Sequence, residues 1–208
     1  ITFNDKLRVQ IITGPNQNGK SRFMDSIGLH QIMFQAGWPI FAQKAEMSPK
    51  TDLRVHYVHS GVGILGESRF SNECQDVFRN FSEFYGAYPL FLIDEPYTGT
   101  NYLDAEQLLK EILLSCSEEN VTVFLTTHFH GLIDFVSSLP NGHNLHCVVT
   151  DDDSFTYKIE EGSSTKSNAL LVAEKAGVRY ENIKSIIKQR RELDYNSFQV
   201  EKKDDLPF

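Results

Sequence analysis

The sequence has few cysteines, no long apolar run and fewer basic than acidic residues, and each scarcity excludes a class of protein. No apolar stretch approaches the roughly 18 residues that a membrane span needs. The three cysteines, Cys74, Cys116 and Cys147, are odd in number and far apart. This pattern favours reduced thiols in the cytoplasm over a disulfide scaffold or a zinc site. The formal net charge of −8 argues against nucleic-acid binding through a broad basic face of this chain.

The sequence also lacks an initiator methionine and a recognisable signal peptide. It begins like the interior of a domain, so we expect further domains upstream. With 208 residues, of which 40% are hydrophobic and 23% charged, the chain can bury the core of an α/β domain. We expect this domain to occupy residues 1–178. Residues 179–208 are expected to form a C-terminal helical segment and tail, a candidate dimerisation element.

Residues 14–21 match the pattern G-x-x-x-x-G-K-[ST] of a phosphate-binding loop. Gly14 and Gly19 let the backbone curl so that successive N–H groups point at phosphate oxygens. Lys20 then reaches the β- and γ-phosphates, and the Ser21 hydroxyl completes the shell of a Mg²⁺ ion. The loop joins an expected strand over residues 7–13 to an expected helix over residues 21–35, whose N-terminus favours anions. The predicted ATP-binding residues are Gly14, Pro15, Asn16, Gln17, Asn18, Gly19, Lys20, Ser21 and Arg22.

Asp94 and Glu95 follow four apolar residues that predict a strand buried on both faces. Beside a phosphate-binding loop, Asp94 is expected to hold Mg²⁺ through water. Glu95 is expected to orient and deprotonate the attacking water. The alternative is that the two acids merely cap the helix that follows.

His128 follows another apolar run, residues 121–127, which predicts a further buried strand. Because strands alternate with helices, we expect a doubly wound α/β sheet whose parallel strands end at the same edge. His128 would then lie near the phosphates, where we expect it to act as a γ-phosphate sensor. The alternative is a histidine that caps a strand end. A metal site at His128, His130 and Asp134 is disfavoured, because Leu132 stands where the H-x-H-x-D-H cluster has aspartate.

The remaining pattern predicts two strands in a hairpin, further helices and some surface residues. His143 and His146 are expected in an exposed turn region. The other expected elements are a strand over 53–58, helices over 70–85, 104–116, 168–176 and 180–193, and hairpin strands over 145–149 and 155–159. The tail beyond residue 195 is expected to fray.

Five motifs, in this order, resemble the ATPase domain of the MutS family. They are Pro15-Asn16 within the phosphate-binding loop, Gly66-Glu67-Ser68-Arg69-Phe70, Asp94-Glu95 through Asn101, Thr126-Thr127-His128, and Tyr157-Lys158-Ile159 through Gly177. The resemblance implies a P-loop fold of the ABC-ATPase class and a dimer that holds each ATP, with Mg²⁺, between subunits. It also implies that Ser68 reaches the γ-phosphate bound by the partner subunit. Ser68 could instead merely cap the helix that follows.

The chain departs from the family at Asn18, which is usually glycine, at Arg22, and over residues 96–98, where an arginine is missing. These departures point to a relative outside the main repair branch. We expect an ATP-hydrolysing domain that acts on double-stranded DNA through domains outside this chain, as a homodimer or with a MutS-like partner, away from membranes. The alternatives are an ABC-type ATPase of another process, whose Leu-Ser-Gly-Gly-Gln signature is absent, and a nucleotide-binding module with little turnover.

Overall fold

The chain divides into two compact units, Ile1–Lys166 and Ser167–Phe208, in a computed structural model. The structure describes residues 6–15, 18–57, 69–119, 121–149, 155–165 and 173–204. The second unit contains α6 (Tyr180–Asp204). None of the helices within these ranges combines the length and apolar character needed to cross a membrane.

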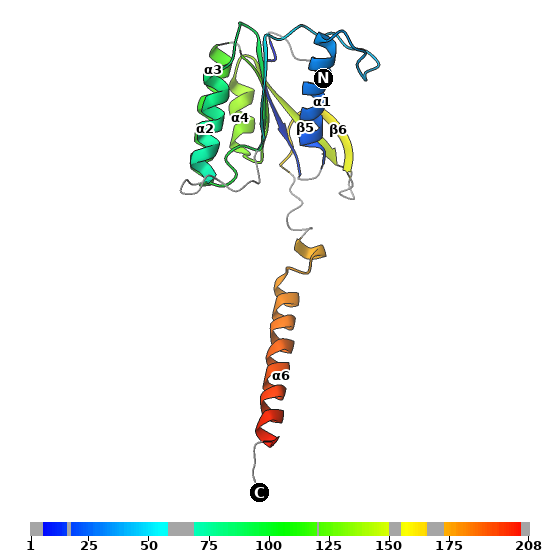
Figure 1. The fold of residues 1–208 in the computed structure, drawn as a ribbon, viewed down its shortest axis with the longest axis vertical. Helices are drawn as coiled ribbons and strands as arrows, with labels where there is room; N and C mark the ends of the chain where they lie inside the picture. The colour runs from blue at the N-terminus through cyan, green and yellow to red at the C-terminus, as the bar shows by residue number, and fades with distance from the viewer. Residues whose placement is uncertain are drawn as a thin grey trace. The chain divides into compact units, whose positions relative to one another are not determined.

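The first unit contains one six-stranded sheet in the order β2-β3-β4-β1-β5-β6. Figure 1 labels β5 and β6 within this unit. The strands are β1 (Val9–Thr13), β2 (Asp52–Tyr57), β3 (Pro89–Asp94), β4 (Thr122–Thr126), β5 (Gly142–Val149) and β6 (Phe155–Glu161). The pairs β1–β4, β1–β5, β2–β3 and β3–β4 are parallel, and β6 alone runs antiparallel to its neighbour β5. The predicted α/β class, with a mostly parallel sheet flanked by helices, is confirmed.

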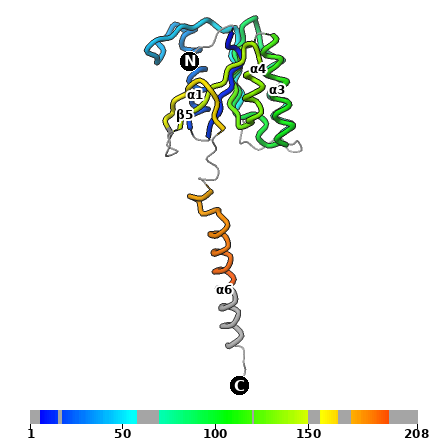
Figure 2. The backbone as a smooth tube through the Cα atoms, turned by 180° about the vertical axis from the view of Figure 1, so that it is seen from behind, coloured from blue at the N-terminus to red at the C-terminus, as the bar shows by residue number. Residues whose placement is uncertain are grey.

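Helices cover both faces of this sheet. They are α1 (Lys20–Gln35), α2 (Arg69–Ser82), α3 (Tyr102–Glu118) and α4 (Gly131–Ser138). Figures 1 and 2 show α1 on one face, with α3 and α4 on the other. Because successive strand residues point to opposite faces, Ile11 packs with the cluster under α2, α3 and α4, whereas Ile12 packs with the cluster under α1. The buried strands therefore read as continuous apolar runs, as expected for a parallel sheet covered on both sides.

Three details of the predicted elements are wrong. The apolar pattern of residues 21–35 places Ile32 on one predicted helix face, and that of residues 70–85 places Phe78 on another. Both side chains are instead exposed, at 58% and 72%. In α1 the buried positions are Lys20, Met24, Gly28 and Gln31, of which the apolar pattern included Met24. The small Gly28 lets the helix approach Leu92 closely. His143 and His146 lie within β5 and are half-buried, because this strand begins at residue 142.

Two helices also differ from the sequence prediction. No helix was predicted over α4, yet Leu132 and Val136, four residues apart, bury one face of a short helix against the sheet. The terminal helix α6 continues to Asp204, well beyond the expected end at residue 193. The reason is visible in the sequence, since no glycine or proline follows Gly177 before Pro207.

Candidate functional site

Three neighbouring strands deliver the candidate residues to one edge of the sheet. β4 lies between β1 and β3, and Thr126 is paired with Ile12 on one side and with Asp94 on the other. Because the three strands are parallel, the segments that follow them all leave from the same edge. The phosphate-binding loop, the two acids and His128 are thereby brought together.

The phosphate-binding loop turns at two glycines with positive φ, Gly14 at 134° and Gly19 at 91°. A Cβ atom on Gly14 would lie 3.0 Å from the Cβ of Cys147, and one on Gly19 would lie 3.2 Å from the ring of Tyr157. Both positions therefore require glycine for backbone conformation and for space. Gly19 is also the N-cap of α1 and has no side chain to cap it. The first N–H groups of the helix are thus suited to an anion.

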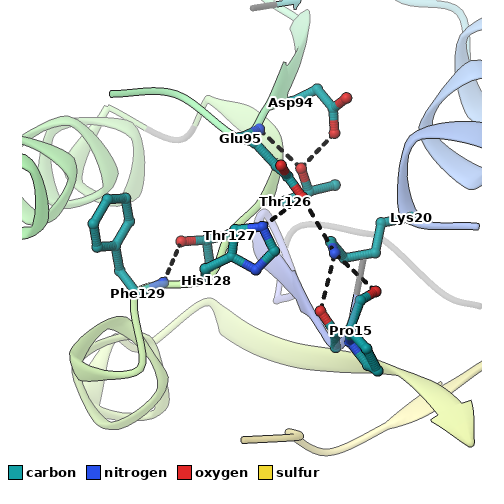
Figure 3. A network of polar contacts seen from close by, with 9 residues as sticks. Pro15, Lys20, Asp94, Glu95, Thr126, Thr127, His128 and Phe129 are labelled. Atoms are coloured by element: carbon teal, nitrogen blue, oxygen red, sulfur yellow. Dashed lines mark hydrogen bonds and ion pairs between the residues drawn. The ribbon is translucent and has the colours of Figure 1, made fainter. Parts of the chain in front are cut away.

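Lys20 is buried, and its ammonium group lies over the turn of the loop. Nζ donates to the carbonyl oxygens of Gly14 at 2.9 Å and Pro15 at 3.1 Å (Figure 3). It also lies 3.2 Å from Oε1 of Glu95. A buried cation held in this way has the charge to neutralise phosphate oxygens at the loop.

The hydroxyl of Thr126 connects the two acids. Its Oγ1 donates to Asp94 Oδ1 at 2.5 Å and accepts from the backbone N–H of Glu95 at 2.9 Å (Figure 3). Thr126 is fully buried. Glu95 has a φ of 44°, a left-handed conformation that is strained for a residue with a side chain. This turn places the Glu95 carboxylate beside Lys20.

His128 contacts the same carboxylate oxygen from the other side, with its Nε2 2.8 Å from Glu95 Oε1 (Figure 3). Burial of Glu95 opposes its ionisation, but the contacts with His128 and then Lys20 outweigh burial, and its pKa lies below the ordinary value. The arrangement therefore keeps Glu95 ionised between Lys20 and His128. A carboxylate in that state can accept a proton from water.

The contacts bear on the alternative that the two acids merely cap the following helix. Helix α3, which follows the two acids, is capped by Asn101, whose side chain accepts from the backbone N–H groups of Leu103 at 2.9 Å and Asp104 at 3.5 Å. Glu95 and His128 are instead in contact at this edge of the sheet.

The other predicted residues lie around the loop with different exposures. Ser21 is partly buried in the first turn of α1. Asn18 is buried, and its Nδ2 donates to Val148 O at 3.5 Å. The Arg22 side chain is 91% exposed, and its Nη1 lies 3.8 Å from Asp25 Oδ2. Asn16, Gln17 and Ser68 lie outside the described residues.

Two residues beside the site received no role from the sequence. Thr126 could be assigned only once the register placed it opposite Asp94. Tyr157, on β6, is 69% exposed and has a φ of 55°, with its ring against Gly19. The sequence named Tyr157 only as the first residue of the fifth motif, and its position beside Gly19 became visible only in the structure.

Comparison with known proteins identifies the family. Residues 10–194 match the family model of MutS domain V. The DNA mismatch repair protein MutS of Leptospira interrogans is 33% identical over 192 residues, which are 89% of this chain and 22% of that protein. MutS of Streptococcus gordonii is 29% identical over 182 residues, or 86% of this chain and 21% of that protein. This sequence thus spans about a fifth of the length of these relatives. Since the family model matches most of its residues, the chain belongs to the MutS family.

Proposed function

We propose that this chain is the ATP-binding and ATP-hydrolysing domain of a MutS-like protein that acts on DNA, with a P-loop NTPase fold of the ABC-ATPase class. The observation that carries the proposal is the convergence of Lys20 and His128 on one oxygen of Glu95, beside the phosphate-binding loop. The relatives are DNA mismatch repair proteins. Since the chain covers about a fifth of their length, we assign contact with double-stranded DNA to other domains.

ATP binding is assigned to residues 14–22, with Lys20 as the cation for the β- and γ-phosphates and the N-terminus of α1 beneath them. The exposed Tyr157 ring lies beside Gly19, at the start of that helix. A flat aromatic face at this position suits the base of the nucleotide, which can stack on it. We therefore add Tyr157 to the nucleotide site.

Magnesium fits the oxygen atoms available. The Asp94 carboxylate and the Ser21 hydroxyl are the hard ligands that Mg²⁺ prefers, and the Thr126 hydroxyl orients Asp94. When bound, the ion would neutralise charge on the phosphate oxygens. Within the described ranges, no group of three or more His, Cys, Asp and Glu side chains is arranged to hold a metal ion on its own. A site completed by phosphate oxygens agrees with that finding.

Hydrolysis is assigned to Glu95 as general base. The oxygen of a water molecule bonds to the γ-phosphorus, the bond to the bridging oxygen of ADP breaks, and the water proton passes to the carboxylate. Phosphate oxygens compete with Glu95 for Lys20. Because the Lys20 contact helps to lower the Glu95 pKa, transfer of Lys20 to phosphate makes Glu95 a stronger base. His128 then donates to the γ-phosphate and distinguishes ATP from ADP.

The active form is proposed to be a dimer, of two copies or with a MutS-like partner, in which Ser68 completes the partner's ATP site. Three free cysteines agree with a cytoplasmic location. An ABC-type ATPase of another process remains the first alternative, but the family match disfavours it. A nucleotide-binding module with little turnover is the second, and the ionised Glu95 disfavours that reading.

Two variants test the proposal against the unchanged protein. Lys20→Ala removes a charge-assisted contact worth roughly 1.5–3 kcal/mol and should weaken ATP binding by about 10- to 100-fold in calorimetry. Glu95→Gln keeps the shape of the side chain but not its basicity. It should bind ATP and turn it over roughly 10²–10⁴ times more slowly, with or without duplex DNA.

Lys50→Ala is a matched control, because Lys50 Nζ donates to Thr122 Oγ1 at the opposite end of β4 from Thr126. It should leave ATP binding and turnover unchanged. Turnover near the normal rate in Glu95→Gln would contradict the assignment of the base. Unchanged ATP affinity in Lys20→Ala would contradict the phosphate site.

A further inference from the structure

The turn that carries Glu95 is held at both of its ends by hydrogen bonds. Glu95 and Tyr97 both have positive φ, 44° and 62°, a conformation that residues with side chains rarely adopt. Thr126 Oγ1 accepts from the backbone N–H of Glu95 at 2.9 Å. Glu73 Oε1 accepts from the backbone N–H of Tyr97 at 2.6 Å. The strained conformation therefore depends on two acceptors, one from β4 and one from α2.

Glu73 is buried for a carboxylate, with 7% of its surface exposed. His56, also 7% exposed, has its Nε2 3.7 Å from the same Glu73 oxygen. The ring of Tyr97 packs edge-on against Phe70 with centroids 5.6 Å apart, and its hydroxyl lies beside Cys74. Helix α2 thus contacts Tyr97 at the backbone and at both parts of its side chain.

Few rotations remain between these two fixed N–H groups. Pro96 lies between them, and its ring fixes one of the intervening backbone angles. Without the Glu73 acceptor, the N–H of Tyr97 would be buried without a partner, and Tyr97 could relax from its positive φ. Relaxation at Tyr97 would turn the Glu95 carboxylate away from Lys20 and His128.

We propose that Glu73 is a positioning residue for Glu95. From α2 it fixes the left-handed turn that holds the general base at the phosphate edge, although it is itself outside contact with the reacting groups. The inference rests on the proposed ATPase function and adds a residue that the phosphate-binding and acid motifs do not include. The backbone N–H of Tyr97 needs a hydrogen-bond acceptor at residue 73, whereas the negative charge of Glu73 is not needed.

A pair of substitutions separates the acceptor from the charge. Glu73→Gln keeps an acceptor oxygen at the same reach, and it should retain most of the kcat for ATP. Glu73→Met has similar length without an acceptor. Because small displacements of a catalytic group are costly, it should lower kcat about tenfold or more while KM for ATP changes by less than about twofold. Equal loss in the two variants would overturn the proposal.

Two controls distinguish positioning from loss of stability. Ser117 donates to Asn141 Oδ1 at 2.7 Å, a buried hydrogen bond remote from the acids, so Ser117→Ala should lower Tm but not kcat. A fall in kcat that follows Tm equally in Ser117→Ala and Glu73→Met would refute the positioning role. In a Glu95→Gln background, Glu73→Met should slow single-turnover hydrolysis little further, because its effect passes through the base. Losses that multiply would instead show an independent role.

The same measurements distinguish a wrong role for Glu73 from a wrong assignment of the ATPase function. If the unchanged protein hydrolyses ATP and Glu95→Gln does not, the function stands whatever Glu73→Met does. If Glu95→Gln retains turnover, Glu95 is not the base, and the positioning role of Glu73 falls with it.

Discussion

At the scale of single residues, the contacts of Glu95 have a consequence for pH dependence. A carboxyl with a lowered pKa stays ionised to lower pH than an ordinary glutamate. The stability that this ionisation contributes is present above the pKa of the unfolded chain and is lost as pH falls through the folded value. The ionised form of Glu95 is also the form proposed to accept a proton. The fall in the rate of ATP turnover at low pH, the acid limb of the pH–rate profile, should therefore report the pKa of Glu95.

Replacing His128 should therefore move that limb. His128→Gln removes the contact that does most to lower the pKa of Glu95, so the pKa rises. The acid limb of kcat/KM for ATP should shift to higher pH in a pH–rate profile. His143 lies on β5, with its Nε2 3.7 Å from Glu161 Oε1. His143→Gln is therefore the control and should leave the acid limb of the pH–rate profile unchanged. A limb that stays unchanged or moves to lower pH in His128→Gln would count against the contact.

Tyr157 allows a test of nucleotide binding that is independent of the phosphates. Tyr157→Ala should weaken ADP and ATP equally, by roughly the 1–3 kcal/mol of one base–aromatic stack, whereas Tyr157→Phe should bind normally. Fluorescence titration with both nucleotides measures this. Tyr180→Ala removes another exposed tyrosine, in the second unit, and serves as control. Loss of ATP affinity alone would point to a phosphate contact instead of a stack.

At the scale of elements, the two faces of a single helix should respond differently to the same substitution. Leu109 of α3 is fully buried, and Leu109→Ala should cost about 2–5 kcal/mol of unfolding free energy. Leu114, in the same helix, is 41% exposed, and its replacement should cost about 0.5 kcal/mol. Denaturant titrations with equal m-values would measure the difference. Similar losses at both positions would show that α3 does not pack as described.

The contrast between buried and exposed apolar residues also explains how much of the fold could be predicted. Strands such as residues 90–93 are continuous apolar runs, so their burial on both faces was readable from the sequence. Phe78 and Ile32 were not readable, because an apolar residue on a helix carries no sign of which neighbour covers it. The short helix α4 was missed because eight residues give barely two turns of periodicity.

Some residues of the candidate site could likewise be predicted from the sequence, and others could not. Lys20, Asp94, Glu95 and His128 could be named, because each belongs to a motif or follows a strand, and parallel strands end at one edge. Thr126 and Glu73 could not, because their roles depend on register and on the packing of α2 against the turn. The left-handed φ of Glu95 leaves no trace in its residue type.

At the scale of the whole molecule, the proposed dimer predicts association that depends on ATP. Glu95→Gln holds ATP without turnover, so sedimentation with ATP should show dimers, whereas Lys20→Ala should stay monomeric. Adding Ser68→Arg to Glu95→Gln should abolish association but leave ATP binding intact. If Ser68 only caps a helix, the change should instead lower stability by roughly 0.5–2 kcal/mol and spare the dimer. Equal dimer fractions with and without Ser68→Arg would refute the composite site.

The place of β1 in the sheet also determines how the first unit can open. Its successive residues Ile11 and Ile12 belong to the two separate core clusters, and β4 and β5 pair with it on either side. Neither helical layer can therefore detach without exposing one face of the same strand. Amide hydrogens of β1, β3 and β4 should exchange with solvent deuterium through one common opening, at the slowest rates in the unit. The edge that holds the phosphate-binding loop would then stay assembled until the whole unit unfolds.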